Sequence, residues 1–523
     1  MTNLYGLLEA VCKKNASRVF FVRDGRTYGD LLTAVKKRAV LLAQKFKIKK
    51  GDTVAILSGN TPEFMQTYFA VSAIGARALM LDTGLAPVEH VNMMKHTKCK
   101  LACAQKSLFV EGAAKMFDIE TIDDTDPDCF EMADVTSDDI LQLSFTSGST
   151  GNPKVVGLTH GNLTALWDGA QFYKQVIHPG FMFYGFLPLY HIYGVVINII
   201  APVSLECSLL LQPVLNPKEF LADFQKYHPE VIPAVPRIWE GFYKKIIAGL
   251  KEKRVYTLAR VILALQKYLP KKLVNKIKKP IHEIFGGRVR VLISAGATLK
   301  PTVRKFFEKL GFSVGDCYGL TETTGPANFN FKFRMDNGKM YYAGPLKGNE
   351  IIIHAPNDEG IGEVWVRGNL VMKEYVGNKQ ATDEAFENGW FKTGDLGVID
   401  KKGRLTIKGR MKQVIVLDSG KNVYPDELED LYLQNDDILA AAVLEREIDG
   451  KMVAYGVFQV KPGTNLEMFK LMLKASNLKI APYKWVTHYA ITEDELPQTS
   501  AKKIQHHKIA EMLDRGEFPT RVE

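Results

Sequence analysis

A loop that combines glycine, hydroxyl residues and one lysine has the composition of a polyphosphate-binding site. Residues 146–154 have the sequence TSGSTGNPK, and the apolar run before them, 140–145, predicts a buried strand. Glycine lets the backbone approach a phosphate, hydroxyl and amide groups donate to its oxygens, and lysine adds positive charge. Because α/β proteins bind ligands where strands end, we predict a phosphate loop that contains Thr146, Ser147, Gly148, Ser149, Thr150, Gly151 and Lys154.

This loop differs from a Walker A motif at the two positions that flank the lysine. Pro153 stands where that motif has glycine, and Val155 stands where it has serine or threonine. A string of this composition is also typical of a flexible surface turn. The rest of the chain therefore has to decide between a phosphate clamp of another nucleotide chemistry and an ordinary turn.

The elements around the loop predict parallel α/β layers. Helical spacing of apolar residues at 28–46 and 62–76 alternates with short apolar runs typical of buried strands, at 53–57, 78–81 and 101–104. A second α/β layer follows, with strands expected at 186–189, 208–211, 231–235 and 289–293. Beyond residue 344 the pattern changes to short alternating strands, at 350–354, 362–367 and 405–408.

The chain of 523 residues is too long for a single hydrophobic core. We predict an α/β fold with a large N-terminal domain, 1–409, made of two doubly wound α/β subdomains plus a barrel-like β subdomain. Residues 410–412 form the expected hinge, and residues 413–523 form a small mobile α+β domain, with a helix at 424–433 and strands at 438–444 and 452–460.

Composition restricts the function classes. Hydrophobic residues at 46% and charged residues at 24% are ordinary globular values, and the six cysteines show no metal-ligand spacing. Reduced thiols and the absence of a basic, then apolar leader at residues 1–5 predict a cytoplasmic protein. The most apolar window, 194–214, is interrupted by Pro202, Glu206 and Pro213, so we expect no transmembrane helix.

Positive charge is the other compositional signal. The 68 Lys and Arg residues exceed the 58 Asp and Glu residues, for a net charge of +10, which favours anionic partners. Between residues 241 and 280, 12 Lys and Arg stand against the single acid Glu252, among apolar residues at near-helical spacing. This segment is either a solvated basic face or a surface for transient contact with an anionic membrane, and neither interpretation requires nucleic acid.

Five separated motifs resemble, in their order, those of the adenylate-forming superfamily, which includes acyl-CoA synthetases, luciferases and peptide-synthetase adenylation domains. The resemblance spans nearly the whole chain and is nearest to the long-chain fatty acyl-CoA synthetases. The matching stretches are the phosphate loop 146–154, YGLTET at 318–323, GWFKTGD at 389–395, GRMK at 409–412 with SGKNV at 419–423, and LPQT at 496–499 through Lys503.

The resemblance implies a nucleotide site built from these motifs. Glu322, with Thr146, would hold Mg²⁺, and Thr321 would present a hydroxyl to phosphate. Asp395 would accept hydrogen bonds from the ribose hydroxyls, and Arg410 would donate to ribose or phosphate. The adenine would lie among Tyr318, Gly319, Gly296 and Ala297.

The C-terminal residues implied by the resemblance depart from the usual pattern. Lys503 corresponds to a mobile lysine that reaches the α-phosphate when the small domain closes, but the family pattern KTxxGK is QTSAKK in this chain. Lys412 corresponds to the hinge between an adenylating and a thioesterifying pose, and Gln413 replaces a more usual acid. Gly420 and Lys421 would line the path of coenzyme A.

The predicted reaction is ATP- and Mg²⁺-dependent activation of a carboxylic acid, followed by thioester formation with coenzyme A. A medium- to long-chain fatty acid is the expected substrate, and Tyr190, His191 and Trp239 are the expected acyl-pocket residues, although Trp239 is equally compatible with core packing. The resemblance places His191 near the substrate carboxylate as a catalytic residue, and a purely structural histidine is the alternative. The alternatives are an acyl carrier protein as acceptor, a reaction that stops at the adenylate, or a non-catalytic nucleotide- or acyl-binding protein. Peripheral membrane contact is a further expectation, and the sequence does not indicate the oligomeric state.

Overall fold

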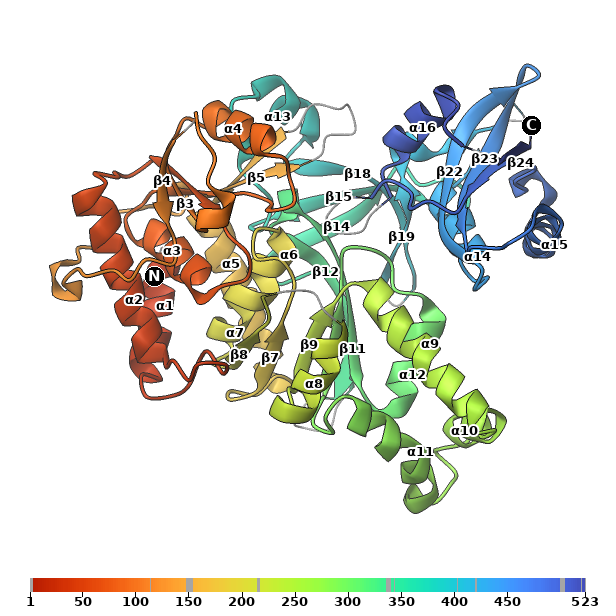
Figure 1. The fold of residues 1–523 in the computed structure, drawn as a ribbon, viewed down its shortest axis with the longest axis horizontal. Coiled ribbons are helices and arrows are strands. Elements are labelled where there is room, and N and C mark those ends of the chain that lie inside the picture. Colours follow the sequence, from red (N-terminus) through yellow and green to blue (C-terminus); the bar gives the residue numbers. More distant parts are fainter. Residues whose placement is uncertain are drawn as a thin grey trace. The chain divides into compact units, whose positions relative to one another are not determined.

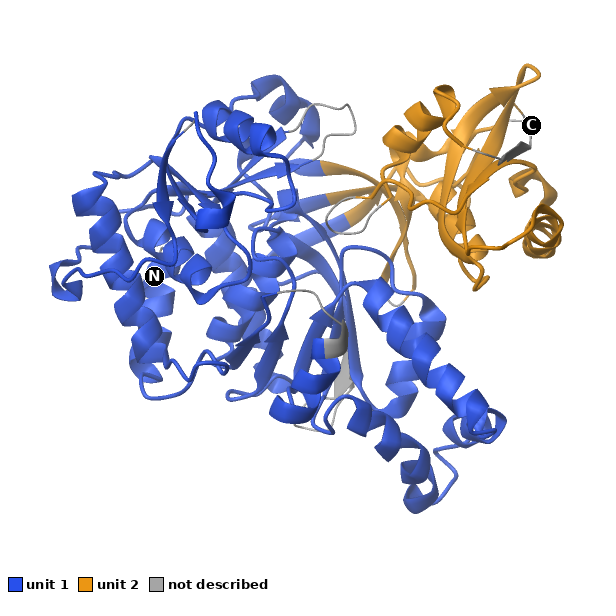
Figure 2. Cartoon of the chain, in the orientation of Figure 1, with its two compact units in different colours: residues 1–351, 366–391 blue, residues 352–365, 392–523 orange. Residues whose placement is uncertain are grey.

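The chain forms two compact units (Figure 2). The computed structural model describes residues 3–112, 114–146, 154–213, 217–334, 340–342, 344–401, 403–418, 421–498, 504–518 and 520–522. Unit 1 contains residues 1–351 and 366–391, and unit 2 contains residues 352–365 and 392–523. The predicted hinge at 410–412 therefore lies within unit 2, and a swing about it stays a prediction.

The first sheet of unit 1 is mostly parallel (Figure 1). Its core strands β1 (Thr53–Leu57) and β2 (Arg77–Met80) are apolar runs that the structure buries almost completely, as expected for strands covered on both faces. The strand order is β16 (Glu374–Tyr375), β6 (Lys154–Thr159), β5 (Ile140–Thr146), β2, β1, β3 (Cys99–Ala104) and β4 (Lys115–Asp118). Helices α1 (Leu4–Lys14), α2 (Tyr28–Val40) and α3 (Pro62–Ala73) pack against one another beside it.

The second sheet of unit 1 has seven strands as well. Its order is β13 (Met340–Tyr342), β12 (Gly325–Arg334), β11 (Ser313–Leu320), β10 (Val291–Ser294), β9 (Val231–Ala234), β7 (Met182–Gly185) and β8 (Ser208–Leu211). One continuous apolar core joins residues of both sheets, among them Val54 and Ile232. The prediction of two doubly wound layers is confirmed.

The strand expected at 186–189 is wrong, because the strand of that region is β7, four residues earlier. Residues after Gly185 form a loop held by side chains: the Asn198 amide donates to the Leu187 carbonyl, and the Leu189 amide donates to Asn60 Oδ1. Pro188 has no N–H for a ladder, which disfavours it in a central strand. The apolar pattern marked a buried loop.

The two sheets share one plan. In each, the sheet continues beyond five parallel strands with two strands that each pair antiparallel with the strand before. These are β6 and then β16 beyond β5, and β12 and then β13 beyond β11. The connections β5 to β6 and β11 to β12 therefore both start at the carboxyl end of the last parallel strand. The two loops with chemical signatures occupy these two equivalent positions.

Three further helices of unit 1 contact strands of the first sheet: α4 (Pro87–His96) contacts β3, α5 (His160–Gln171) contacts β6 and α13 (Lys379–Ala385) contacts β16. The other helices of unit 1 are α6 (Ile192–Gly194), α7 (Ala201–Ser204), α8 (Pro217–Tyr227), α9 (Pro236–Glu252), α10 (Tyr256–Ala264), α11 (Lys271–Ile284) and α12 (Pro301–Leu310), and α9 to α11 form one end of the unit (Figure 1). The predicted β subdomain is a branched five-stranded sheet of β14 (Asn349–His354), β15 (Gly362–Gly368), β18 (Trp390–Ile399) and β17 (Phe386–Glu387), with β19 (Leu405–Arg410) paired to β18.

Unit 2 contains the predicted small α+β fold. Its four-stranded sheet has the order β22 (Ile438–Ile448), β23 (Lys451–Val460), β24 (His488–Thr492) and β25 (Thr520–Val522). Alternate residues of β22 enter two separate cores: Val443 packs in the cluster that includes α14 (Pro425–Tyr432) and α15 (Leu466–Asn477), and Ala442 packs in the cluster that includes α16 (His506–Asp514). The period-2 alternation of a strand thus lets helices cover both faces.

Across the described residues, no helix has the length and apolar character that a membrane span requires.

Candidate functional site

The phosphate loop begins and ends at paired residues. Thr146, the last residue of β5, lies opposite Lys154, the first residue of β6, so the antiparallel pair brings the two ends of the loop together. The residues between them, including Ser147, Gly148, Ser149, Thr150 and Gly151, lie outside the described part of the chain. α5 follows β6 directly, and its N-cap Thr159 exchanges hydrogen bonds with Asn162. Strands β5 and β6 and the capped helix α5 therefore support the two ends of the loop.

The second signature loop is a tight turn between β11 and β12. Its three residues, Thr321–Thr323, form a single 3₁₀ turn. The Thr323 hydroxyl bonds the Leu320 and Gly325 carbonyls, and Thr324 adopts a left-handed conformation with φ 53°. A Cβ at Gly319 would lie 1.7 Å from the Gly325 carbonyl oxygen, so only glycine fits between the two strands. This packing fixes the position of Glu322.

Tyr375 connects the two loops. Its hydroxyl donates to Glu322 Oε1 at 3.0 Å, while Lys154 Nζ lies 4.5 Å from the centroid of its ring. Strand β16 places it there by pairing with β6, and the Met372 amide donates to the Glu322 carbonyl at 2.7 Å. Lys154 and Glu322 come from different motifs and different sheets, and the structure brings both to one tyrosine.

Tyr375 is a site residue that sequence reasoning missed. It lies in a two-residue strand outside every signature motif, and nothing in the local pattern of the residues around it marks a function. Its place follows from a long-range strand pair.

The predicted magnesium ligands are hard oxygen donors that suit this ion. Glu322 offers a carboxylate and Thr146 a hydroxyl, each at the end of a parallel strand. No group of three or more His, Cys, Asp or Glu side chains arranged for a metal occurs among the described residues. Mg²⁺ is commonly held by one or two protein oxygens together with substrate phosphates and water. The residues present therefore fit Mg²⁺ only as a partner of a bound polyphosphate.

The carboxyl ends of β9, β10 and β11 form the other side of the site. Gly296 and Ala297 follow β10 and are exposed, and Gly296 has φ 90°, a conformation that favours glycine. Tyr318 lies in β11, beside the turn that holds Thr321 and Glu322. These residues, predicted to surround adenine, therefore lie at one edge of the second sheet, where open α/β sheets bind their ligands.

A half-buried acid and a half-buried tyrosine lie just inside this edge. The Tyr193 hydroxyl donates to the Ala234 carbonyl at 3.2 Å, at the end of β9, and the pKa of Tyr193 is raised by burial and by nearby Cys317 and Asp316. Burial raises the pKa of Asp316 to about 7, although Arg304 favours its ionised form. The protonated carboxyl is therefore substantially populated at neutral pH.

The three predicted acyl-pocket residues differ in their surroundings. Tyr190 and His191 lie in the loop after β7, and His191 Nε2 is 4.0 Å from Asp82 Oδ2, so this histidine faces an acid of the first sheet. Trp239 in α9 is only 1% exposed, donates its indole N–H to the Ile293 carbonyl at 3.2 Å and contacts Phe307 edge-on. The structure gives Trp239 the contacts of a core residue, which was the alternative interpretation.

Unit 2 holds the predicted ribose-binding pair. Asp395 in β18 lies opposite Arg410 in β19, and Arg410 Nε is 2.8 Å from Asp395 Oδ1. The Arg410 side chain also donates to the Thr393 carbonyl at 3.2 Å. Asp395 is 4% exposed, so the ion pair fixes its carboxylate. Arg410 is expected to position Asp395 in addition to any contact with nucleotide.

The other predicted residues of unit 2 are only partly described. Lys412 lies in a 3₁₀ turn, Met411–Gln413, directly after β19. Lys421 Nζ lies 4.5 Å from the ring centroid of Tyr483. Gly420 and the predicted catalytic residue Lys503 lie outside the described residues, so their roles stay predictions.

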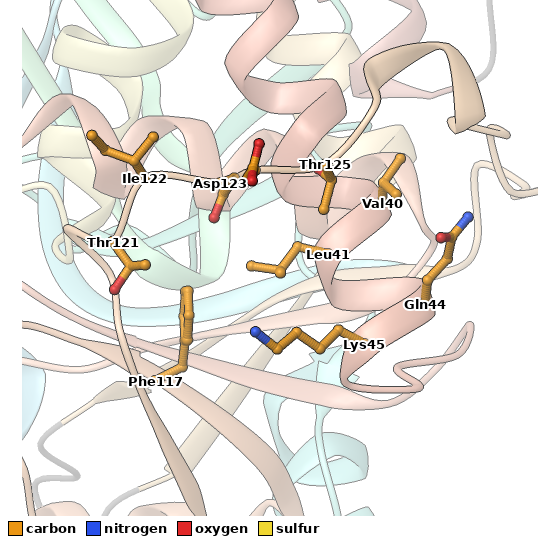
Figure 3. Close-up of a pocket in the computed structure, with 10 residues that line it drawn as sticks. Val40, Leu41, Gln44, Lys45, Phe117, Thr121, Ile122, Asp123 and Thr125 are labelled. Carbon is orange, nitrogen blue, oxygen red and sulfur yellow. The ribbon is translucent and has the colours of Figure 1, made fainter.

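A surface pocket of about 400 Å³ is lined by residues that belong to none of these motifs. Figure 3 shows its lining. It is bordered by the end of α2 and by the loop after β4, with Leu41, Lys45, Phe117 and Asp123 among its residues. Asp123 pairs with the buried Arg38, which is held in turn by the Thr67 hydroxyl and by the Ile119 carbonyl. Since it contains no predicted site residue, this pocket is separate from the candidate nucleotide site.

Comparison with known proteins decides the family. The family model described as AMP-binding enzyme matches residues 8–376, which include the phosphate loop, Glu322 and Tyr375. The chain belongs to the AMP-binding enzymes. The predicted resemblance to the adenylate-forming superfamily is thereby confirmed.

Two curated relatives illustrate the range of this AMP-binding enzyme's similarities. It is 30% identical over 425 residues to a long-chain-fatty-acid–CoA ligase of Mycobacterium tuberculosis, covering 73% of this chain and 69% of that protein. It is 28% identical over 518 residues to a 2-succinylbenzoate–CoA ligase of Bacillus velezensis, covering 96% of each.

A solved structure confirms the fold. The o-succinylbenzoate coenzyme A synthetase of Bacillus subtilis, determined in complex with ATP and magnesium ion, has a TM-score of 0.76 at 23% identity. The match covers 98% of this chain and 99% of that one. The α/β class and the whole-chain extent of the fold are therefore as predicted.

Proposed function

We propose that this AMP-binding enzyme is an ATP-dependent acid–CoA ligase that forms an acyl-adenylate and then an acyl thioester. The observation that carries the proposal is the convergence of Lys154 and Glu322 on Tyr375, which joins the two signature loops of a family member at one point. Relatives named as CoA ligases over most of the chain support the same reaction.

The first half-reaction builds up negative charge on the phosphates of ATP, and this chain supplies groups that can neutralise it. The substrate carboxylate oxygen bonds to the α-phosphorus of ATP, and the bond from that phosphorus to the bridging oxygen breaks to release pyrophosphate. Lys154 and the donors of the phosphate loop neutralise the charge on the leaving group. Glu322, with Thr146, would hold Mg²⁺, which would supply positive charge to the phosphates when it is bound.

The second half-reaction transfers the acyl group to a thiol. The sulfur of coenzyme A attacks the acyl carbonyl, its proton passes to solvent, and AMP leaves. Lys412 is the proposed hinge about which the small domain swings between the pose for adenylation and the pose for thioester formation. Gly420 and Lys421 line the proposed path of coenzyme A. Lys503 serves the carboxylate and the α-phosphate in the first half-reaction.

The proposed acid is a medium- to long-chain fatty acid. A fatty acid has one carboxylate, which is consumed by adenylation, and an apolar body that needs no charged partner. A relative named long-chain-fatty-acid–CoA ligase, 30% identical over 425 residues, supports this choice of acid.

An aromatic dicarboxylate is the second candidate substrate, because relatives aligned over nearly the full chain are 2-succinylbenzoate–CoA ligases. That acid keeps one carboxylate after adenylation, which must be held by a cation or by hydrogen-bond donors. A pyrophosphate-release screen with acetate, decanoate, palmitate, benzoate and 2-succinylbenzoate separates the candidates. Highest kcat/KM with decanoate or palmitate supports the proposal, and highest kcat/KM with 2-succinylbenzoate overturns the fatty-acid assignment.

The acceptor is tested in the same assay format. Thioester formation with coenzyme A, and little with a purified acyl carrier protein, supports the CoA ligase. Transfer to the carrier protein alone supports the first alternative, and pyrophosphate release with neither acceptor consumed supports an adenylate-forming ligase. ATP binding without pyrophosphate release from any acid indicates a non-catalytic binding protein.

The altered C-terminal motif provides a direct test of the catalytic proposal. Lys503→Ala is expected to reduce pyrophosphate release by more than about a hundredfold, because it removes the charge proposed to reach the reacting phosphate. Lys502→Ala is the matched control, one residue earlier, and is expected to stay within about threefold of the wild type. Equal losses in both variants contradict the assignment of Lys503.

A cytosolic location belongs to the proposal as well, supported by six free cysteine thiols.

A further inference from the structure

The positive charge of the molecule is concentrated in one short segment of unit 1. Residues 241–280 hold 12 of the 68 Lys and Arg residues and one of the 58 Asp and Glu residues, so the rest of the chain has 56 against 57. The net charge of +10 therefore comes from this segment, while the remainder is close to neutral. Helices α9, α10 and α11 form it, at one end of unit 1 (Figure 1).

Helix α10 is apolar on two faces, of which the fold covers one. Ala259, Ile262 and Leu263 are buried, and α10 packs on α9, α11 and α12. Leu258 and Val261, on the other side of the helix, are 57% and 45% exposed. A helix with apolar residues all round is normally buried, so this outer face is unusual for a surface helix.

The exposed apolar face continues beyond the helix. Leu265 is 47% exposed and Tyr268 is 86% exposed, and both follow Val261 at three- to four-residue intervals. Leu258, Val261, Leu265 and Tyr268 make up this apolar tip, and exposed cationic side chains lie next to them in the sequence. Arg260, Lys267, Lys271 and Lys272 are all exposed beside it in the sequence. A contiguous apolar patch with a basic border marks an interaction surface.

We propose that this apolar tip and its basic border dock unit 1 on the surface of an anionic phospholipid bilayer. Leucine, valine and tyrosine side chains enter the boundary between headgroups and acyl chains, and lysine and arginine neutralise anionic headgroups. The net +11 of residues 241–280 complements such a surface. A nucleic acid or an acidic protein matches the charge as well, but a phosphate backbone offers no apolar partner for Leu258, Val261 and Leu265.

The docking is peripheral and reversible. Each Lys or Arg near an anionic surface contributes about 1 kcal/mol, and salt screens this attraction within about 10 Å at 0.1 M. The inference concerns only where unit 1 docks, so it stands whatever acid the enzyme activates. A bilayer at this surface also brings the enzyme to amphipathic carboxylic acids, which accumulate there.

The test uses the full-length protein and sedimentation with vesicles of two compositions. We expect binding to phosphatidylcholine vesicles that contain about 30 mol% phosphatidylserine and at least tenfold weaker binding to phosphatidylcholine alone. Binding should weaken as NaCl rises from about 0.1 to 0.5 M. A wild-type protein that stays in the supernatant with the anionic vesicles at low salt overturns the proposal.

Two triple variants separate the charge from the apolar tip. Lys267→Gln with Lys271→Gln and Lys272→Gln should weaken binding to anionic vesicles by about a hundredfold. Leu258→Gln with Val261→Gln and Leu265→Gln should weaken it by more than about tenfold, because the polar side chains no longer enter the bilayer. All six side chains are exposed, and unchanged melting temperatures exclude unfolding as the cause.

Control variants remove three charges or two apolar side chains from other surfaces. Lys49→Gln with Lys95→Gln and Lys401→Gln takes three exposed lysines from other surfaces, and Leu471→Gln with Leu478→Gln takes two exposed leucines from unit 2. Both should bind vesicles within about twofold of the wild type. Equal losses in a control and its test variant overturn the proposal.

Competing partners give different outcomes in the same variants. Binding of a single-stranded oligonucleotide that displaces the vesicles, and that survives the leucine and valine substitutions, indicates a nucleic-acid surface and overturns the bilayer assignment. The same pattern with a purified acidic carrier protein indicates a protein surface and overturns it too. A Tyr268→Trp variant whose added fluorescence shifts to the blue with anionic vesicles supports the proposed position of the tip.

Discussion

Among single residues of the candidate site, Tyr375 contacts a side chain from each of the two signature loops. Its hydroxyl holds Glu322 Oε1 at 3.0 Å, and its ring faces the ammonium group of Lys154. A carboxylate that is held by a hydrogen bond keeps one orientation, which a ligand for phosphate-bound Mg²⁺ requires. We therefore regard Tyr375 as a positioning residue for both loops.

Substitution of Tyr375 by phenylalanine tests this role. The change removes the hydrogen bond to Glu322 and leaves the ring beside Lys154, so kcat/KM for ATP in pyrophosphate release should fall about tenfold. Tyr375→Leu should lose more, because the cation–π contact goes as well. In a double variant with Glu322→Gln, the Tyr375→Phe effect should nearly disappear. Fully additive effects contradict a role that acts through Glu322.

Sequence patterns indicated candidate residues of the site but not their contacts. Lys154 and Glu322 stand in motifs whose composition suits phosphate and metal, so each was predicted without a fold. Tyr375 and the Asp395–Arg410 ion pair depend on strand pairing. Such pairs form between segments whose local sequence does not specify the partner. Trp239 shows the same limit, because a tryptophan before a basic helix does not reveal whether it packs in a core or lines a pocket.

At the scale of elements, the start of α5 contains a histidine that carries a pH dependence. His160 is 0% exposed, and its two ring nitrogens have no hydrogen-bond partner. Burial lowers the pKa of His160 to about 4; nearby Asp139 acts in the opposite direction and Lys50 in the same one. The unfolded chain gains a proton near pH 6.5, whereas the folded chain gains it near pH 4. Stability from this group is therefore present above pH 6.5 and is lost as the pH falls toward 4.

Substitution of His160 by leucine should reduce this pH dependence. Between about pH 6.5 and pH 5 the wild type should lose about 2 kcal/mol of unfolding free energy through this residue, and His160→Leu should lack that part of the loss. Urea unfolding of both proteins at the two pH values measures the difference. Parallel curves for wild type and variant contradict the assignment.

The turn between β11 and β12 provides a second test at this scale. Gly319→Ala places a Cβ 1.7 Å from a backbone oxygen, so the strands must separate and stability should fall by about 2–3 kcal/mol. The rise in melting temperature that ATP causes should disappear as well, because Glu322 moves with the turn. Gly249→Ala in α9 is the control: nothing lies within 4 Å of its Cβ, and helix propensity should make it stabilising by up to about 1 kcal/mol. Equal melting temperatures for the two variants contradict the steric argument.

Strand prediction succeeded where a buried apolar run pairs its backbone with neighbouring strands, and failed where side chains satisfy the backbone of such a run instead. β1 and β9 are continuous apolar segments that the fold buries, so composition was sufficient. Residues 186–189 are equally apolar but form a loop whose backbone is satisfied by Asn198 and Asn60. A buried loop of this kind depends on side chains far away in the sequence, which no local pattern contains.

The whole molecule combines two sheets with one plan and a separate small unit. The two signature loops lie at equivalent positions of the two sheets, where the parallel order ends, which explains why two unrelated motifs belong to one site. Residues proposed for the later steps, including Lys412 and Lys421, lie in unit 2. The proposed reaction therefore divides its residues between two compact units, and the predicted hinge belongs to this scale.

Substitution of Lys412 by proline tests whether a swing of the small domain separates the half-reactions. Proline fixes φ near −65° and restricts the residue before it, so the segment Met411–Gln413 keeps fewer backbone states. Pyrophosphate release in a single turnover should stay within about twofold of the wild type, while acyl-CoA formation should fall at least about tenfold. Lys412→Ala, which removes the side chain and leaves the backbone free, should keep both rates. Equal losses of both half-reactions in the proline variant contradict a hinge at this position, because a general distortion would slow adenylation as much as thioester formation.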